Sequence, residues 1–300
     1  MDDATFRREL DRTTVRLLER HLATAKEWFP HTLVPWSRGR DFAEGEEWDA
    51  TRAPLDDAVR SALLVNLLTE DNLPHYFGTI SRFDDGGAWS EWARRWTAEE
   101  GRHAIVIRDY LTVTRALDPV ALERARMAQV SGGVVPDPPS MADGIAYVAL
   151  QEIATRIAHR NTGKLLDDPV GFEIMARVAV DENLHHLFYR DLVSVAIELD
   201  PSVMVLAIDR QVRDFAMPGL GIADFTSHAR RIAAAGIYDF AVHHDQILVP
   251  VVVRHWRVGD LEGLSPEAEE ARVRVLTHIE RLGRAAARIA ARRAPATASA

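Results

Sequence analysis

The sequence has 300 residues, of which 47% are apolar and none is cysteine, and its formal net charge is −9. This composition suits a globular protein with a sizeable core. It excludes disulfides, cysteine-held iron–sulfur clusters and thiolate zinc sites, and it disfavours non-specific nucleic-acid binding. The charged N-terminus lacks the apolar run of a signal peptide, and no stretch is apolar over the roughly 18 residues of a membrane span. We therefore expect a cytoplasmic protein.

Helical periodicity dominates the chain, so the predicted fold is all-α with little or no sheet. Residues 30–53 are rich in Trp, Pro, Gly and Asp and are predicted to be irregular. We expect one domain over 1–292 and a disordered tail over 293–300. The predicted helices span 5–27, 55–77, 88–116, 119–129, 141–166, 169–198, a short segment from 201, 223–252 and 265–292.

Two Glu-x-x-His units occur in the sequence, and another glutamate lies thirty residues upstream of each. The two triplets, with a constant offset of 82 positions, are Glu70, Glu100, His103 and Glu152, Glu182, His185. Because residues i and i+3 share a helix face, each unit can aim a carboxylate and an imidazole at one ion. The six residues fall on four separate predicted helices. This pattern predicts two metal ions inside a ferritin-like four-helix bundle with additional flanking helices.

The alternative interpretation of these residues is ordinary surface charge. Glu70 and Glu152 each follow an apolar run, where an unpaired carboxylate would be costly, so we favour metal ligation. Oxygen and nitrogen ligands without sulfur suit iron or manganese better than a closed structural zinc site. Pro74 lacks the amide that would bond to the carbonyl of Glu70, and it predicts either a kink or the end of that helix.

The other histidines carry less information. We expect His186 to face a neighbouring helix, since it lies about 100° around the helix from His185. Four others are expected to be structural or surface residues: His75, His159, His243 and His244.

Several segments resemble, in order, motifs of the soluble acyl-carrier-protein desaturases. TEDNLPHY at 69–76 resembles their TEExLPTY, and WTAEEGRH at 96–103 resembles WTAEENRH. The remaining matches are QEIAT with HRNT at 151–162, AVDENLH at 179–185, and RHWRV at 254–258. The short segment before Trp28 is more similar to the bacterial members. Gly101 departs from the family's Asn and costs the helix about 1 kcal/mol relative to Ala.

The resemblance implies a homodimeric di-iron enzyme that inserts a cis double bond into an acyl chain carried on acyl carrier protein. Dioxygen is consumed, and ferredoxin supplies electrons. Carried over position by position, the iron ligands are the same six residues found by spacing. Thr155 matches a threonine beside the irons that takes part in oxygen activation. Asp181 matches a carboxylate that links a histidine ligand, by analogy His103, to a tryptophan, here Trp28.

Two other functions remain open at this point. A hydroxylase or N-oxygenase would keep the two metals and change the substrate, whereas iron storage or metal sensing would need no catalysis. An acidic carrier protein would dock on basic residues, for which Arg230 and Arg231 are the candidates, although an ordinary solvated helix face is the simpler interpretation of this pair.

Overall fold

The computed structural model describes residues 3–52, 55–83, 86–219 and 221–293. These residues form helices and connecting segments without any strand, which confirms the all-α prediction. Most of the predicted tail, residues 294–300, lies outside the described residues. In chain order the helices are α1 (Asp3–Thr24), α2 (Pro30–Leu33), α3 (Asp57–Asp71), α4 (Leu73–Ser81), α5 (Ala88–Thr114), α6 (Pro119–Gly132), α7 (Met141–Leu165), α8 (Pro169–Leu199), α9 (Pro201–Arg213), α10 (Phe225–Ala234), α11 (Phe240–His243), the π-helix η3 (His244–His255) and α12 (Pro266–Arg293). Short 3-10 turns cover Trp36–Arg38, Ala50–Arg52 and Val258–Asp260.

Asp-Pro pairs begin three of these helices. Asp118, Asp168 and Asp200 are the N-cap residues of α6, α8 and α9, and each side chain accepts a backbone amide of the first turn. The following proline needs no amide partner there, and its φ already suits a helix. Ser140 caps α7 in the same way. These caps fix where the ligand-bearing helices α7 and α8 begin.

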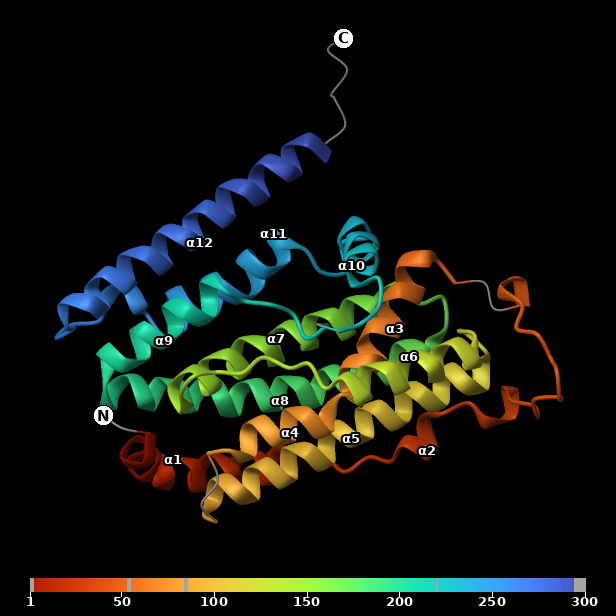
Figure 1. Ribbon diagram of the computed structural model, residues 1–300, viewed down its shortest axis with the longest axis horizontal. Coiled ribbons are helices and arrows are strands. Elements are labelled where there is room, and N and C mark those ends of the chain that lie inside the picture. The colour runs from red at the N-terminus through yellow and green to blue at the C-terminus, as the bar shows by residue number, and fades with distance from the viewer. Residues whose placement is uncertain (1–2, 53–54, 84–85, 220, 294–300) are drawn as a thin grey trace, which may run out of the picture.

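Helices α3, α5, α7 and α8 carry the predicted ligands. Helices α7 and α8 lie side by side along their length, with α5 and α4 on one side of them and α9 and α12 on the other (Figure 1). Helix α1 packs against both α5 and α8. The layers bury one apolar cluster around α7, α8, α9 and η3 and a second around α3 and α5. The ligand-bearing segments are therefore held between two packed cores.

Two predicted helices are wrong in their extent. The segment 55–77 is interrupted at Asn72, and Pro74 lies in the first turn of α4, so the chain ends one helix and begins another. The segment 223–252 is divided because Gly236 takes a positive φ of 72° after α10 and Asp239 caps α11. It continues as a π-helix that contains Pro250, whose missing amide breaks the ordinary ladder.

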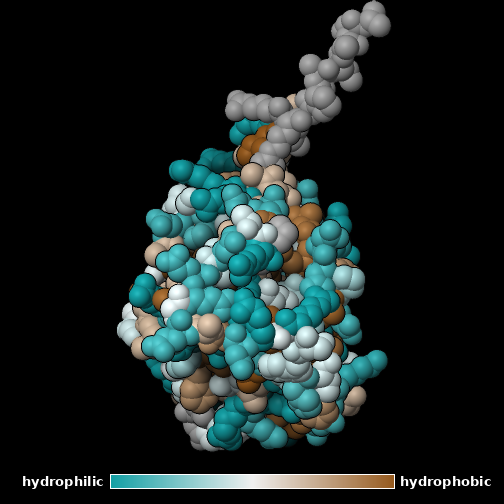
Figure 2. Space-filling view, turned by 90° about the vertical axis from the view of Figure 1, so that its right-hand side faces the viewer, coloured by the Kyte–Doolittle hydropathy of each residue, from teal (hydrophilic) through white to brown (hydrophobic). Residues whose placement is uncertain are grey.

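No helix among the described residues is long and apolar enough to cross a membrane. The face turned toward the viewer in Figure 2 is mainly hydrophilic, with small groups of hydrophobic residues scattered over it.

Candidate metal centre

The structure brings the six predicted ligands together in the middle of the bundle. All six are buried, and Glu100 is the most exposed at 6%. Their ligand atoms form two overlapping groups, each with every atom within 4.8 Å of the others. The first group is Glu70, Glu100, His103 and Glu182, and the second is Glu100, Glu152, Glu182 and His185. Glu100 and Glu182 belong to both groups, which is the arrangement that two ions sharing bridging carboxylates require.

Both imidazoles turn Nδ1 toward the carboxylates. His103 Nδ1 lies 3.3 Å from Glu100, 3.4 Å from Glu182 and 3.7 Å from Glu70. His185 Nδ1 lies 2.8 Å from Glu100 and 3.5 Å from Glu152. Each histidine therefore faces its own lone glutamate and at least one of the two shared carboxylates.

Several of these converging atoms have no hydrogen bond within the described part of the chain. They are Nδ1 of His103, Nδ1 of His185, Oε1 of Glu100 and Oε2 of Glu152, all fully buried. Buried polar atoms are normally hydrogen-bonded, and unpaired ones are costly. Lone pairs converging from carboxylates and imidazoles are what a divalent cation binds, so the residues present fit a pair of metal ions.

The pKa shifts of the cluster residues also favour the binding of cations. Burial raises the pKa of Glu152 well above its usual value, and the neighbouring Glu182 and Glu100 raise it further. Burial alone would lower the pKa of the two histidines, but the carboxylates, Glu100 foremost, outweigh it and raise the pKa of His103 and His185. The cluster thus binds protons in the absence of other cations, and metal ions would displace them.

On the outer side of His103, the structure places Asp181 and Trp28 together. Asp181 Oδ2 lies 3.5 Å from His103 Nε2 and accepts a 2.8 Å hydrogen bond from Trp28 Nε1. The guanidinium groups of Arg102 and Arg177 lie over the indole of Trp28, 4.9 and 5.7 Å from its ring centre. Arg102 and Arg177 also pair with Asp181. This carboxylate is therefore held by three partners besides the histidine.

His185 has a corresponding carboxylate that sequence reasoning missed. Glu99 Oε2 lies 3.0 Å from His185 Nε2 and 2.9 Å from Nε2 of His21, which comes from α1. The signal was present in the sequence, because Glu99 precedes Asp181 by the same 82 residues that relate the ligands. The hydrogen bond to Glu99 fixes the tautomer and orientation of the His185 ring. His103 Nε2 lies 3.5 Å from Asp181 without a hydrogen bond to any described residue.

The remaining carboxylates also have fixed partners. Thr155 Oγ1 donates a 2.7 Å hydrogen bond to Glu182, and Trp96 Nε1 donates a 3.0 Å bond to Glu152. His159 Nε2 lies 3.0 Å from Glu70 Oε1, and its side chain is almost fully buried. Of the two alternatives predicted for His159, a structural or a surface residue, the structure therefore excludes the surface one and places it beside the ligand cluster. On α7 it follows Thr155 by four residues and so shares its face.

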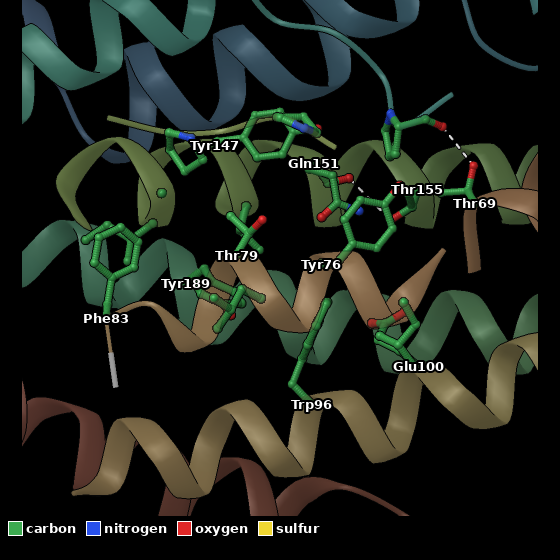
Figure 3. Close-up of a pocket in the computed structure, with 18 of the residues that line it drawn as sticks. Thr69, Tyr76, Thr79, Phe83, Trp96, Glu100, Tyr147, Gln151, Thr155 and Tyr189 are labelled. Atoms are coloured by element: carbon green, nitrogen blue, oxygen red, sulfur yellow. Dashed lines mark hydrogen bonds between the residues drawn. The ribbon is translucent and has the colours of Figure 1, made fainter. Parts of the chain in front are cut away.

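An apolar cavity begins at the ligand cluster. It encloses about 800 Å³, part of it open to solvent, and it touches Glu70, Glu100, Glu182 and Thr155. In Figure 3, Glu100 and Thr155 lie toward one end and Phe83 lies at the other. Its apolar lining includes Leu73, Ile80, Phe83, Met141, Ile145 and Val148. A flexible hydrocarbon chain fits such a lining. A polar group attached to that chain would lie toward the ligands or toward the surface.

A second cavity of about 610 Å³ meets the first at Glu70 and Thr155. His159 and Tyr238 are among the residues that line it. Between the two cavities, Thr69 Oγ1 donates a 2.8 Å hydrogen bond to the carbonyl of Pro218 (Figure 3). This bond ties α3 to the segment before α10, so Glu70 and Thr155 are reached from two sides.

The other predicted residues lie away from this centre. His186 is buried against α7, where Nδ1 donates to the carbonyl of Ala149, as expected of a residue facing a neighbouring helix. Arg230 and Arg231 lie on α10, and Arg231 lines a surface groove together with Arg60. Three acidic side chains line the same groove, so it offers no clear excess of positive charge for an acidic carrier.

Comparison with known proteins points to one family. A family model described as fatty acid desaturase matches residues 3–300. DesA1 of Mycobacterium tuberculosis, provisionally named an acyl-carrier-protein desaturase, is 40% identical over 283 residues, 91% of this chain and 83% of its own. Acyl-carrier-protein desaturase 6, chloroplastic, of Oryza sativa subsp. japonica is 32% identical over 271 residues, 82% of this chain and 64% of its own. The X-ray structure of M. tuberculosis DesA2, also provisionally named an acyl-ACP desaturase, aligns with a TM-score of 0.71 and 26% identity, over 89% of this chain and 99% of that one.

Proposed function

The chain belongs to the fatty acid desaturase family, and on that basis we propose that it inserts a cis double bond into an acyl chain bound to acyl carrier protein. The proposed cofactor is a pair of iron ions held by Glu70, Glu100, His103, Glu152, Glu182 and His185. The proposed partners are acyl carrier protein, a ferredoxin-type electron donor and a second copy of this chain, with the cytoplasm as the location. The names of DesA1 and of the Oryza sativa relative support the carrier.

The observation that carries this proposal is the contact between ligands and cavity. Glu100, Glu182 and Thr155 line the cavity wall, so a methylene group lying there would be next to the metal ligands. When bound, the two irons would supply the redox chemistry for reducing dioxygen and oxidising an unactivated carbon–carbon single bond. Electrons and protons balance in this reaction. Dioxygen accepts two electrons and two protons from the acyl chain, two electrons from the donor and two protons from solvent, and two waters are formed.

Residues of the protein hold the proposed ligands in position. The two shared carboxylates belong to Glu-x-x-His units on facing helices, and Thr155 Oγ1 holds Glu182 in place. The hydroxyl of Thr155 lies on the cavity wall, where it can exchange a proton with a group bound beside the ligands. The apolar lining excludes water from the rest of the acyl chain and aligns the substrate. Oxidation is thereby limited to the carbons that reach the ligands.

Product analysis tests the proposal. The iron-loaded protein is incubated with acyl-ACP substrates of several chain lengths, reduced ferredoxin and dioxygen, and the released acids are analysed by mass spectrometry. A cis-monoene supports desaturation, whereas a hydroxylated product without alkene rejects it in favour of a hydroxylase. Glu182→Gln should abolish the product, and Glu173→Gln, an exposed position on the same helix, should not. Failure of the reduced protein to consume dioxygen would favour metal storage.

A further inference from the structure

His21 connects the first helix of the chain to the metal centre. It lies in the last turn of α1 and is 3% exposed. Its Nε2 is 2.9 Å from Glu99 Oε2, and the same oxygen is 3.0 Å from Nε2 of His185. The His21 ring also stacks on His185, with centroids 5.8 Å apart, and meets Trp92 edge-on at 5.0 Å. One carboxylate oxygen thus serves two buried imidazoles.

The shared acceptor determines which nitrogen of each imidazole carries its proton. A carboxylate oxygen only accepts hydrogen bonds, so both rings must present N–H at Nε2. Arg95 pairs with the other oxygen of the Glu99 carboxylate, Oε1. With its proton on Nε2, His185 turns the Nδ1 lone pair toward Glu100 and Glu152, where an ion would bind.

The two halves of the centre are supported differently. On the His103 side the outer carboxylate is held by Trp28, Arg102 and Arg177, none of which belongs to α1. On the His185 side Glu99 is held by Arg95 and, at 3.6 Å, by Arg102, both from its own helix, and by His21 from α1. The other ring nitrogen of His21, Nδ1, has no hydrogen bond to any described residue. A side chain selected for packing alone would not bury an unpaired nitrogen at a free-energy cost.

We propose that His21 is a positioning residue for the half of the metal centre formed by Glu152 and His185. It holds Glu99, and through Glu99 it fixes the orientation and tautomer of His185. The inference rests on the metal binding proposed above and adds to it that one ion, and not the other, depends on the docking of α1. Loss of such an outer hydrogen bond typically lowers metal affinity about 10- to 100-fold.

Cobalt titration of the apoprotein tests the proposal, because Co²⁺ binding is followed by its absorption without any turnover. The wild-type protein should bind two ions per chain. His21→Leu should weaken one ion about 10- to 100-fold and leave the other unchanged. His21→Gln, whose amide can donate from the position of Nε2, should bind both ions nearly as the wild type does. Trp28→Phe, which removes the donor to Asp181, should weaken the opposite ion.

Double variants identify the affected ion. In a His185→Ala background, which removes that half-site, His21→Leu should have no further effect on the remaining ion. In a His103→Ala background it should weaken the ion that is left. If His21→Leu does not fold, His21→Asn, whose amide is too short to reach Glu99, takes its place.

Three results would overturn the inference. The first is a lowered melting temperature of apo His21→Leu with both affinities unchanged, as packing alone would give. The second is an equal loss of both ions, and the third is a loss that persists in the His185→Ala background. A wild-type protein that binds fewer than two ions would overturn the metal proposal itself, and this inference with it.

Discussion

Replacing Glu152 by glutamine should change stability in opposite directions with and without metal. The side chain is fully buried, and Oε2 has no hydrogen bond to any described residue. Burial, Glu182 and Glu100 raise its pKa well above the usual value, so an ionised Glu152 opposes folding of the apoprotein. Glutamine keeps the acceptor for Trp96 and carries no charge. Relief of an unsatisfied buried group is worth about 1–3 kcal/mol, and the apo variant should gain that much.

Bound metal reverses the order of stability between the variant and the wild type. At free ion concentrations a thousandfold above Kd, each bound ion stabilises the wild-type protein by about 4 kcal/mol. A loss of affinity of about a thousandfold or more on removing the Glu152 carboxylate takes away nearly all of that gain, about 4 kcal/mol, which exceeds the gain of about 1–3 kcal/mol in the apo variant. The loaded variant should therefore be less stable than the loaded wild type, although the apo variant is more stable than the apo wild type.

Thermal unfolding with chelator and with anaerobic Fe²⁺ measures both states. About 1 kcal/mol corresponds to a shift of roughly 2–4 °C in the melting temperature of a large domain, so both changes are readily resolved. Glu173→Gln, exposed on α8, is the control and should shift neither state. If Glu152→Gln destabilises the chelated protein as much as the loaded one, Glu152 is a structural hydrogen-bonding group and the argument for a cation at this position fails.

Four further outcomes are expected. Thr155→Val should lower the rate of double-bond formation relative to dioxygen consumption in coupled assays, whereas Thr155→Ser should restore it; equal coupling in both would exclude a role for the hydroxyl. His159→Phe should weaken binding of one ion about 10- to 100-fold in metal titrations, and unchanged affinity would make its contact with the cluster incidental. Gly101→Ala should raise the free energy of unfolding by about 0.5–1 kcal/mol, because a Cβ there would make only an ordinary van der Waals contact, 3.9 Å from Leu73; a loss of stability would contradict this. Burial lowers the pKa of His243 from 6.5 to about 4, so the unfolded chain binds the proton first and stability should fall by up to about 3 kcal/mol as the pH drops through that interval. His243→Asn, which keeps an acceptor for Tyr238, should flatten this slope in denaturant titrations, and an unchanged slope would assign it to other groups.

Local signals predicted the extents of three of the four ligand helices to within two residues, α5, α7 and α8, but missed the break in 55–77 at Asn72. Asp-Pro pairs mark helix starts because the aspartate caps and the proline needs no amide partner. The internal repeat then placed both Glu-x-x-His units at one level of the bundle. Neither inference depended on distant contacts, which is why both agree with the structure.

Other features depend on contacts between distant segments. The bond between His21 and Glu99 joins residues 78 positions apart, and nothing local marks His21 as different from the other histidines. The π-helix η3, in which Pro250 breaks the ordinary ladder, also packs against α7 and α12, which are distant in the sequence. His159 is an intermediate case, since its spacing of seven from Glu152 already places it on the ligand face.

The repeat and its exceptions together explain why the two halves of the centre differ. The offset of 82 relates the ligands and also the outer carboxylates Glu99 and Asp181, so the inner geometry is close to symmetric. An arginine four residues before each carboxylate, Arg95 and Arg177, follows the same offset. The aromatic donors come from outside the repeat and are unlike, an indole on one side and an imidazole on the other. The cavities are also one-sided, because they touch Glu70 and the shared carboxylates but not Glu152 or His185. A repeat that builds two similar groups of candidate ligands, enclosed by unequal helices, thus gives one group that faces the apolar cavity and one that is closed behind α1.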